Sequence, residues 1–110
     1  MAYDEDLANR IREVVHGEPG LSEKRMFGGL AFLVAGKMAV AASTGGLMVR
    51  VDPTRPDDGV DGPHVRPVRM RGREMNGWLH VDADVLESDE DLRRWVGQGV
   101  AYARSLLPPT

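Results

Sequence analysis

Cysteine is absent from this 110-residue chain, which excludes disulfides, zinc–thiolate sites, iron–sulfur clusters and cysteine nucleophiles. No apolar run approaches the roughly 18 residues that are needed to cross a membrane. The first residues, MAYDEDL, also lack the positive and apolar regions of a secretory signal. The sequence therefore predicts a cytoplasmic protein that does not enter a membrane.

A net positive charge is also absent, and aromatic side chains are scarce. The formal net charge is −3 and aromatic residues make up 5% of the chain. The protein therefore has no overall basic field, and any affinity for nucleic acid must come from a local patch. The length suits one hydrophobic core and not two. We therefore expect a single domain over residues 1–110.

Helix signals occur near both ends of the chain. Asp4 can cap a first helix in which apolar residues recur at helical spacing, with His16 at its negative end and Gly17 and Pro19 ending it. Ser88 can cap a second helix whose apolar side consists of Leu92, Trp95, Val96, Val100, Ala103, Leu106 and Leu107. Gly97 and Gly99 interrupt this helix, and each destabilises it by about 1 kcal/mol relative to alanine. The helix therefore either approaches the sheet closely there or is locally weak.

Between the two helices the pattern is extended. The segment 52–63, DPTRPDDGVDGP, is rich in proline, glycine and aspartate, and it predicts a loop with at most one helical turn. The fold class is therefore α+β, with two layers, an antiparallel five-stranded sheet and the helices on one face. The expected strands are 24–34, 38–42 and 47–51 before the loop, and 65–71 and 75–82 after it.

Alternate side chains of a strand point to opposite faces of a sheet, so the two faces can be compared. The face expected under the helices collects Met26, Leu30, Phe32, Val34, Met38, Val40, Leu47, Val49, Val51, Val68, Met70, Leu79 and Val81. The other face collects Phe27, Ala31, Leu33, Ala39, Ala41, Met48, Arg50, Arg69, Arg71, Trp78, His80 and Asp82. We expect no helix layer over this second face.

An uncovered apolar surface edged by arginine is typical of an interface. The predicted anchors are Phe27, Leu33, Met48 and Trp78, for a protein partner or for a symmetric homodimer through this surface or a neighbouring edge. The alternative is that a loop such as 52–63 folds over the face.

Arginines concentrate in the stretch HVRPVRMRGR. The candidates for binding a phosphate, in nucleic acid or in a small anion, are Arg69, Arg71 and Arg73, with Arg66 beside them and Arg25 and Arg50 expected nearby. The alternative is a solvated hairpin whose arginines pair with the acidic residues that follow. With a net charge of −3, the second interpretation is favoured.

One stretch has the spacing of a metal site. His80, Asp82 and Asp84 would share one side of a strand, and two carboxylates with an imidazole can bind Fe(II) or Mn(II). A half-exposed strand shows the same alternation, and no second histidine stands at a supporting spacing. We therefore expect no metal and no cofactor, and because no serine lies in a nucleophile motif, no catalytic residues.

Two adjacent glycines, Gly28 and Gly29, stand inside the apolar stretch KRMFGGLAF. A phosphate-binding turn would need a helix after the glycines, whereas the pattern after Gly29 remains extended. A β-bulge, a sharp bend or the close approach of a helix is the favoured interpretation.

Four stretches together resemble the TfoX N-terminal domain family over nearly the whole chain. They are KRMFGGLAFLVAGKMAVAA, LMVRV, GREMNGWLHVD and LRRWVGQGVAYARSLLPP. The motif of the family maps onto Arg25, Met26, Phe27, Gly28 and Gly29, with Gly77 and Trp78 in the later strand.

The resemblance implies an α+β sheet domain from a family of regulators of DNA-uptake competence. Full-length regulators of this family add a C-terminal domain, so this chain resembles a stand-alone N-terminal domain. The resemblance implies no catalytic residue and leaves the biochemical activity unassigned. It therefore favours a non-enzymatic interaction or regulatory module.

Overall fold

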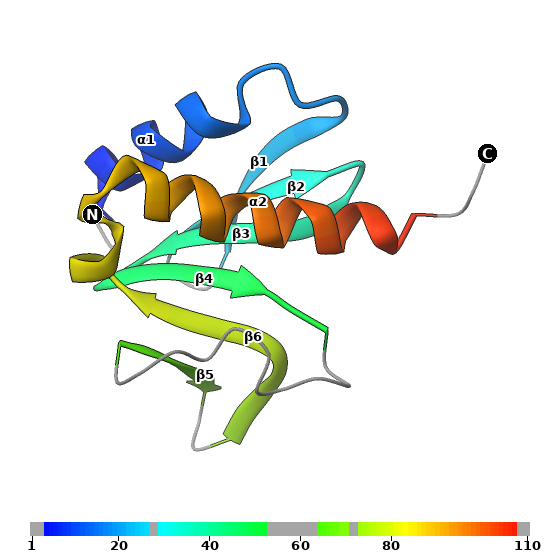
Figure 1. Cartoon of the computed structure of the whole chain (residues 1–110). Helices are drawn as coiled ribbons and strands as arrows, with labels where there is room; N and C mark the ends of the chain where they lie inside the picture. The colour runs from blue at the N-terminus through cyan, green and yellow to red at the C-terminus, as the bar shows by residue number, and fades with distance from the viewer. Residues whose placement is uncertain (1–3, 27–28, 53–63, 71–72, 108–110) are drawn as a thin grey trace.

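A computed structural model of the chain describes residues 4–26, 29–52, 64–70 and 73–107, with the side chains of Met26, of residues 69–70 and of residues 73–76 left out. The α+β class is confirmed, because α1 and α2 lie together over one face of a single sheet (Figure 1). The elements are α1 (Glu5–Val15), β1 (Leu21–Met26), β2 (Gly29–Val34), β3 (Lys37–Ser43), β4 (Gly46–Arg50), β5 (Val65–Met70), β6 (Arg73–Asp82), the 3-10 helix η1 (Ala83–Glu87) and α2 (Asp89–Ser105).

The sheet is antiparallel, and its strands follow the order β1-β2-β3-β4-β6-β5. The described residues form six strands, so the prediction of five was wrong. The stretch 24–34, expected as one strand, consists of the end of β1 and all of β2, which pair as a hairpin from Met26 and Gly29 outwards. Gly29 is thus the first residue of a new strand, whereas Phe27 and Gly28 lie outside the described residues.

At Gly29 and at Gly99 the backbone of β3 is so close that there is no space for a β-carbon. A β-carbon on Gly29 would overlap the carbonyl oxygen of Ala42, across the β2–β3 pairing. A β-carbon on Gly99 would overlap the carbonyl oxygen of Ala39 on β3. The close approach of α2 to the sheet is therefore confirmed at Gly99. At Gly97, on the exposed side of α2, a β-carbon would meet nothing within 4 Å.

Both predicted helix caps are confirmed. The Asp4 carboxylate accepts hydrogen bonds from the backbone N–H groups of Asp6 (2.9 Å) and Leu7 (3.2 Å). The Ser88 hydroxyl accepts one from the N–H of Asp91 at 3.4 Å. Since the first N–H groups of a helix have no partner inside the helix, these caps fix where α1 and α2 begin.

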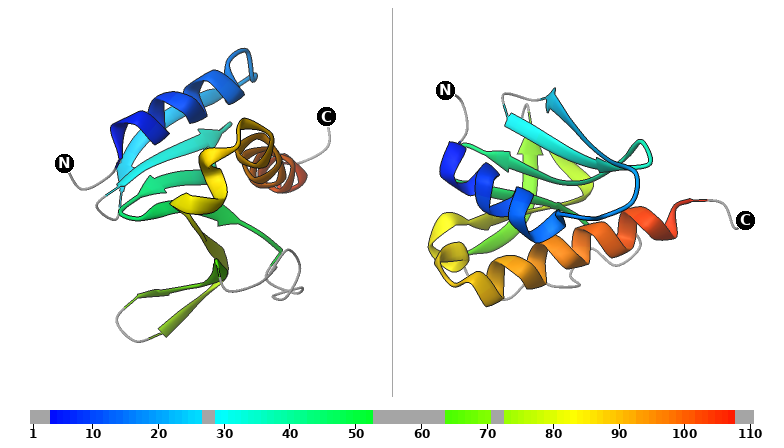
Figure 2. Two further views of the ribbon diagram at one scale, coloured as in Figure 1. Left: turned by 60° about the vertical axis from the view of Figure 1, so that its left-hand side comes forward. Right: turned by 90° about the horizontal axis from the view of Figure 1, so that it is seen from above.

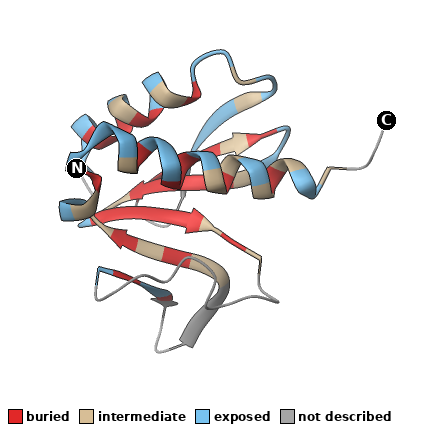
Figure 3. Cartoon of the chain, viewed as in Figure 1, coloured by how far each residue is buried: buried red, intermediate tan, exposed pale blue. Residues whose placement is uncertain are grey.

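Ion pairs join the segments around the two helices. Arg10 of α1 reaches Asp89, the first residue of α2, at 3.0 Å. Arg104, near the end of α2, binds Glu18 at 2.5 Å, in the connection that follows α1. The hydrophobic core lies between these helices and the sheet (Figure 3). Its largest fully buried side chains include Phe32, Ile11, Leu47, Leu79, Leu86 and Leu92.

Two irregularities change which side chains face the helices. In the β2–β3 pairing, Phe32 is opposite Val40 but Leu33 is opposite Met38, so the register shifts by one residue at Ala39. Met38 therefore lies on the second face, whereas Ala39 packs with Val34 and Ala103 of α2. A second shift lies between Pro67 and Arg69. The sequence predicted the opposite face for Met38 and Ala39, because a bulge inverts strict alternation. It also predicted the wrong face for Val68, which alternation from the buried Val65 places on the second face.

The two glycines of α2 make a matched pair for measuring stability. Gly97→Ala is expected to raise the free energy of unfolding by about 1 kcal/mol, since alanine favours the helix and the site is open. Gly99→Ala is expected to lower it by about 2 kcal/mol, because the new methyl group overlaps the backbone of β3. Chemical denaturation of both variants measures the difference. Equal effects of the two substitutions would contradict the close approach at Gly99.

Candidate functional site

The distal face of the sheet, opposite the helices, carries the second apolar cluster. It consists of Ala31, Ala41, Met48 and Val68, which are buried, and of Leu33, Met38 and Trp78, which are partly buried. Three of the four predicted anchors, Leu33, Met48 and Trp78, therefore meet in one cluster, and the fourth, Phe27, lies outside the described residues. Met48 is only 5% exposed. The accessible part of the distal face is thus narrower than the sequence indicated and centres on Leu33, Met38 and Trp78.

Trp78 and Arg50 are neighbours on the distal face. They are directly opposite each other in the β4–β6 pairing. The Arg50 guanidinium donates a hydrogen bond to the carbonyl oxygen of Met38 at 3.4 Å, and Arg50 is partly buried. An arginine is thereby held beside a half-exposed tryptophan, with neighbouring methionine and leucine. Such a mixture of aromatic, aliphatic and guanidinium groups is enriched at protein–protein interfaces.

The position of Trp78 follows from a bend at Gly77. Gly77 has φ +87°, in the left-handed region that favours glycine. Its carbonyl oxygen accepts a hydrogen bond from the N–H of Val51 at 2.8 Å. Beyond this point the first half of β6 pairs only with β5, and the β5–β6 hairpin leaves the rest of the sheet (Figure 2). The Gly77–Trp78 pair therefore sets where the hairpin diverges.

Polar side chains gather around Asp82 at one end of the distal face. The Asp82 carboxylate accepts a hydrogen bond from Arg66 at 2.8 Å and lies 3.3 Å from Nδ1 of His64. His80 lies on the same side, with its Nδ1 3.4 Å from Asp82. The hydrogen bonds from Arg66 and then His64 lower the pKa of Asp82 from its ordinary value of 3.8. The cluster therefore joins β5 to β6 through one carboxylate.

The metal-like spacing of His80, Asp82 and Asp84 does not form a site. Asp84 belongs to the 3-10 helix η1 and is exposed, away from the strand geometry that would align it. Across the described ranges no group of three histidine, aspartate or glutamate side chains could hold a metal ion. The role of His64 was missed, since only the β5–β6 register brings it opposite Asp82. Arg66 also occupies the carboxylate that a cation would need.

The candidate arginines fall in different places. Arg66 and Arg50 lie on the distal face, but Arg25 lies on β1 at the opposite edge of the sheet and is paired with Leu30, on the helix side. Of the two arginines expected near Arg69, Arg71 and Arg73, Arg25 therefore lies at the far edge of the sheet from the β5–β6 hairpin. Arg69 and Arg73 belong to the β5–β6 hairpin, and their side chains are not described. Arg71 lies outside the described residues.

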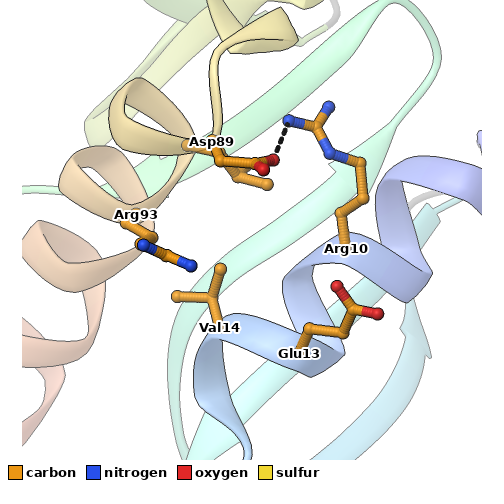
Figure 4. Close-up of a pocket in the computed structure, with 6 residues that line it drawn as sticks. Arg10, Glu13, Val14, Asp89 and Arg93 are labelled. Carbon is orange, nitrogen blue, oxygen red and sulfur yellow. Dashed lines mark hydrogen bonds and ion pairs between the residues drawn. The ribbon is translucent and has the colours of Figure 1, made fainter.

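Two small hollows on the helix side share Arg10. The first, of about 70 Å³, lies between α1 and α2 and is lined by Arg10, Glu13, Val14, Asp89, Leu92 and Arg93 (Figure 4). The second, of about 220 Å³, is lined by Asp4, Asp6, Leu7, Arg10, Ala83, Asp84, Leu86 and Glu87. In the first hollow two arginines balance two carboxylates, and Arg10 is bound to Asp89. Neither hollow combines a nucleophile with a base in the way that a catalytic site requires.

The described residues form a two-layer α+β domain, with one face of the sheet under the two helices and the other face carrying the partly buried cluster around Trp78. The chain belongs to the TfoX N-terminal domain family, whose model matches residues 13–103. This family is of the regulatory type and is not known as enzymatic. Comparison with curated proteins and with solved structures found no match. In the described part of the chain, no helix is long and apolar enough to cross a membrane.

The low pKa of Asp82 gives a pH-dependent contribution to stability. A carboxyl group whose pKa is lower in the folded than in the unfolded state stabilises the fold above its unfolded value, and the contribution disappears as pH falls through the folded value. Asp82→Asn should therefore be less stable than wild type near neutral pH and equally stable in strong acid. Urea unfolding at a series of pH values measures this. A stability difference that does not change with pH would contradict the role of the charge.

Proposed function

We propose that this protein is a non-enzymatic regulatory module, a single TfoX N-terminal-like domain that acts by contacting another protein through the distal face. The observation that carries the proposal is the half-exposed cluster of Leu33, Met38 and Trp78 beside Arg50, on the sheet face that no described helix covers. Buried apolar and aromatic anchors with an arginine are the groups that contribute most of the free energy of binding at interfaces.

The charges around the cluster suggest the chemistry of the partner. Arg50 is held on the distal face by its hydrogen bond to Met38. Arg66 stands at the far end but is neutralised by Asp82. A partner that fits would present an apolar surface with a carboxylate placed to meet Arg50, since a guanidinium pairs well with a carboxylate.

The family supports this function at a coarse level. TfoX N-terminal domains are competence-regulator-like, and a regulator acts through contacts with other macromolecules. The described residues offer no metal-ligand group and no nucleophile beside a base.

Site-specific photocrosslinking tests the proposal. Benzoylphenylalanine at position 78 replaces one large aromatic side chain by another, and the same residue at the exposed Ala101 of α2 serves as the control. We expect one protein to be captured in the native host from position 78 and not from position 101. The purified partner should then bind wild type at least about tenfold more tightly than Trp78→Glu, because a charge replaces a buried anchor.

Met48 is unsuitable for this experiment. It is almost fully buried, so a charged residue there would disrupt the fold as well as the interface. Leu33→Glu, at the partly buried edge of the cluster, is the better second variant. Equal capture from positions 78 and 101, with unchanged binding by folded Trp78→Glu, would overturn the proposed surface.

The alternative function is binding of nucleic acid or a small anion by the Arg66–Arg73 hairpin. The departure of the β5–β6 hairpin from the sheet favours it, because a projecting arm could follow a phosphate backbone (Figure 2). The ion pair between Arg66 and Asp82 weighs against it, since this guanidinium already has an anion. With a net charge of −3, long-range attraction of a polyanion is also weak.

Titration of labelled double- and single-stranded DNA at low and moderate salt separates the two functions. We expect no saturable binding at either salt concentration. Saturable binding that falls steeply with salt and is lost in the Arg69→Ala, Arg71→Ala, Arg73→Ala triple variant would establish the alternative instead. Asp82→Asn, which releases Arg66, should then strengthen binding, and this serves as an internal check.

A further inference from the structure

The two edges of the sheet differ in the regularity of their backbone pairing. β5, at one edge, contains Pro67 and an irregular register, and both features hinder the addition of another strand. β1, at the other edge, has no proline, and its pairing with β2 is regular from Leu21 to Met26. A regular edge strand presents a row of unpaired backbone groups that a further strand can join.

The β1–β2 register shows which backbone groups of β1 do not form hydrogen bonds with β2. The N–H of Ala35 donates to the carbonyl oxygen of Gly20 at 2.9 Å, so this pair is hydrogen-bonded across the hairpin. Because hydrogen-bonded and non-hydrogen-bonded pairs alternate in antiparallel strands, Ser22 and Lys24 also bond towards β2. The N–H and C=O groups of Glu23 and Arg25 therefore point outwards, away from the sheet.

The side chains of this edge are exposed and carry a self-complementary pattern. Ser22, Glu23, Lys24 and Arg25 are all exposed. Glu23 and Arg25 lie on the helix side, where the Glu23 carboxylate binds Arg12 of α1 at 2.8 Å. Lys24 lies on the distal side, opposite Ala31. The C-terminal end of β1 lies away from both helices in the right-hand view of Figure 2.

We propose that β1 pairs with β1 of a second copy of this chain, antiparallel and in register about Lys24, so that two sheets become one continuous sheet. The two-fold axis of the dimer is then perpendicular to the sheet, because the helices of both copies lie on the same face of the continuous sheet. Glu23 of each copy lies opposite Arg25 of the other, and these are the residues whose backbone groups point outwards. Each such pair exchanges both backbone hydrogen bonds and adds Arg25 of one copy to the Glu23–Arg12 ion pair of the other.

The second copy fits better than an unrelated extended segment because the charge pattern of β1 complements itself. A symmetric register about Glu23 or about Arg25 would place two like charges opposite each other and remove both Glu23–Arg25 pairs. In the proposed register the one unfavourable contact is Lys24 against Lys24 of the second copy, on the distal side. This like-charge contact weakens the dimer and gives the register a measurable signature.

This inference goes beyond the proposed function, since it adds a second copy of the chain as a partner. It uses a different surface, however, because the edge of β1 is separated from Trp78 by β2, β3 and β4. If no dimer forms, the proposed contact at Trp78 is therefore not contradicted. If no protein is captured from position 78, the proposed dimer is likewise not contradicted.

The absence of native cysteine allows a direct test by disulfide trapping. Lys24 meets itself as a non-hydrogen-bonded pair, with Cα atoms about 4.5 Å apart, which suits a disulfide. Under mild oxidation, full-length Lys24→Cys is expected to form a covalent dimer much faster than the control Ser105→Cys, whose residue is exposed at the end of α2. Equal rates for the two variants would overturn the register.

Sedimentation of cysteine-free variants supplies the second measurement. Arg25→Glu should weaken self-association by about tenfold or more, because both opposite-charge pairs become like-charge pairs. Lys24→Thr should strengthen it about threefold or more, because the like-charge contact is removed. A monomer at all concentrations for wild type and Lys24→Thr, together with unselective trapping at position 24, would overturn the proposal.

Discussion

The approach of α2 to β3 at Gly99 is the contact on which the rest of the structure depends. A β-carbon there would overlap the carbonyl oxygen of Ala39, so the helix lies as close to the sheet as backbone allows. Ala39 packs against α2 because the register shift in the β2–β3 pairing turns its side chain towards the helix. The same shift places Met38 on the distal face. The irregularity at Ala39 therefore turns Ala39 towards α2 and also places Met38 on the distal face.

The two faces of the sheet consequently have different roles. The helix side is fixed by fully buried residues such as Phe32 and Leu79 and by ion pairs, of which Arg104–Glu18 joins chain segments far apart in sequence. The distal side has fewer buried residues and retains Trp78 at intermediate exposure beside Arg50. Stability therefore resides mainly on one face, and the other face retains side chains suited to recognition.

Local signals predicted much of the fold. Asp4 and Ser88 were expected as caps and are caps, because capping depends on a few neighbouring residues. The family motif was also recognised from local sequence. The split of 24–34 into β1 and β2 was missed, because an apolar stretch with two glycines fits a bent strand as well as a hairpin. The residues of the candidate site were only partly predicted: Leu33, Met48 and Trp78 share a cluster, whereas Arg25 lies elsewhere.

The sequence by itself determined the α+β class, the positions of the two helices and the family, since periodicity, caps and motifs are properties of short segments. Tertiary structure alone decided the facing of Met38 and Ala39, the meeting of His64 with Asp82, and the place of β1 at an edge. Each of these depends on strand register, and a shift of one residue inverts a face while leaving the local pattern unchanged. Pairing between distant segments sets that register, and no single segment contains it.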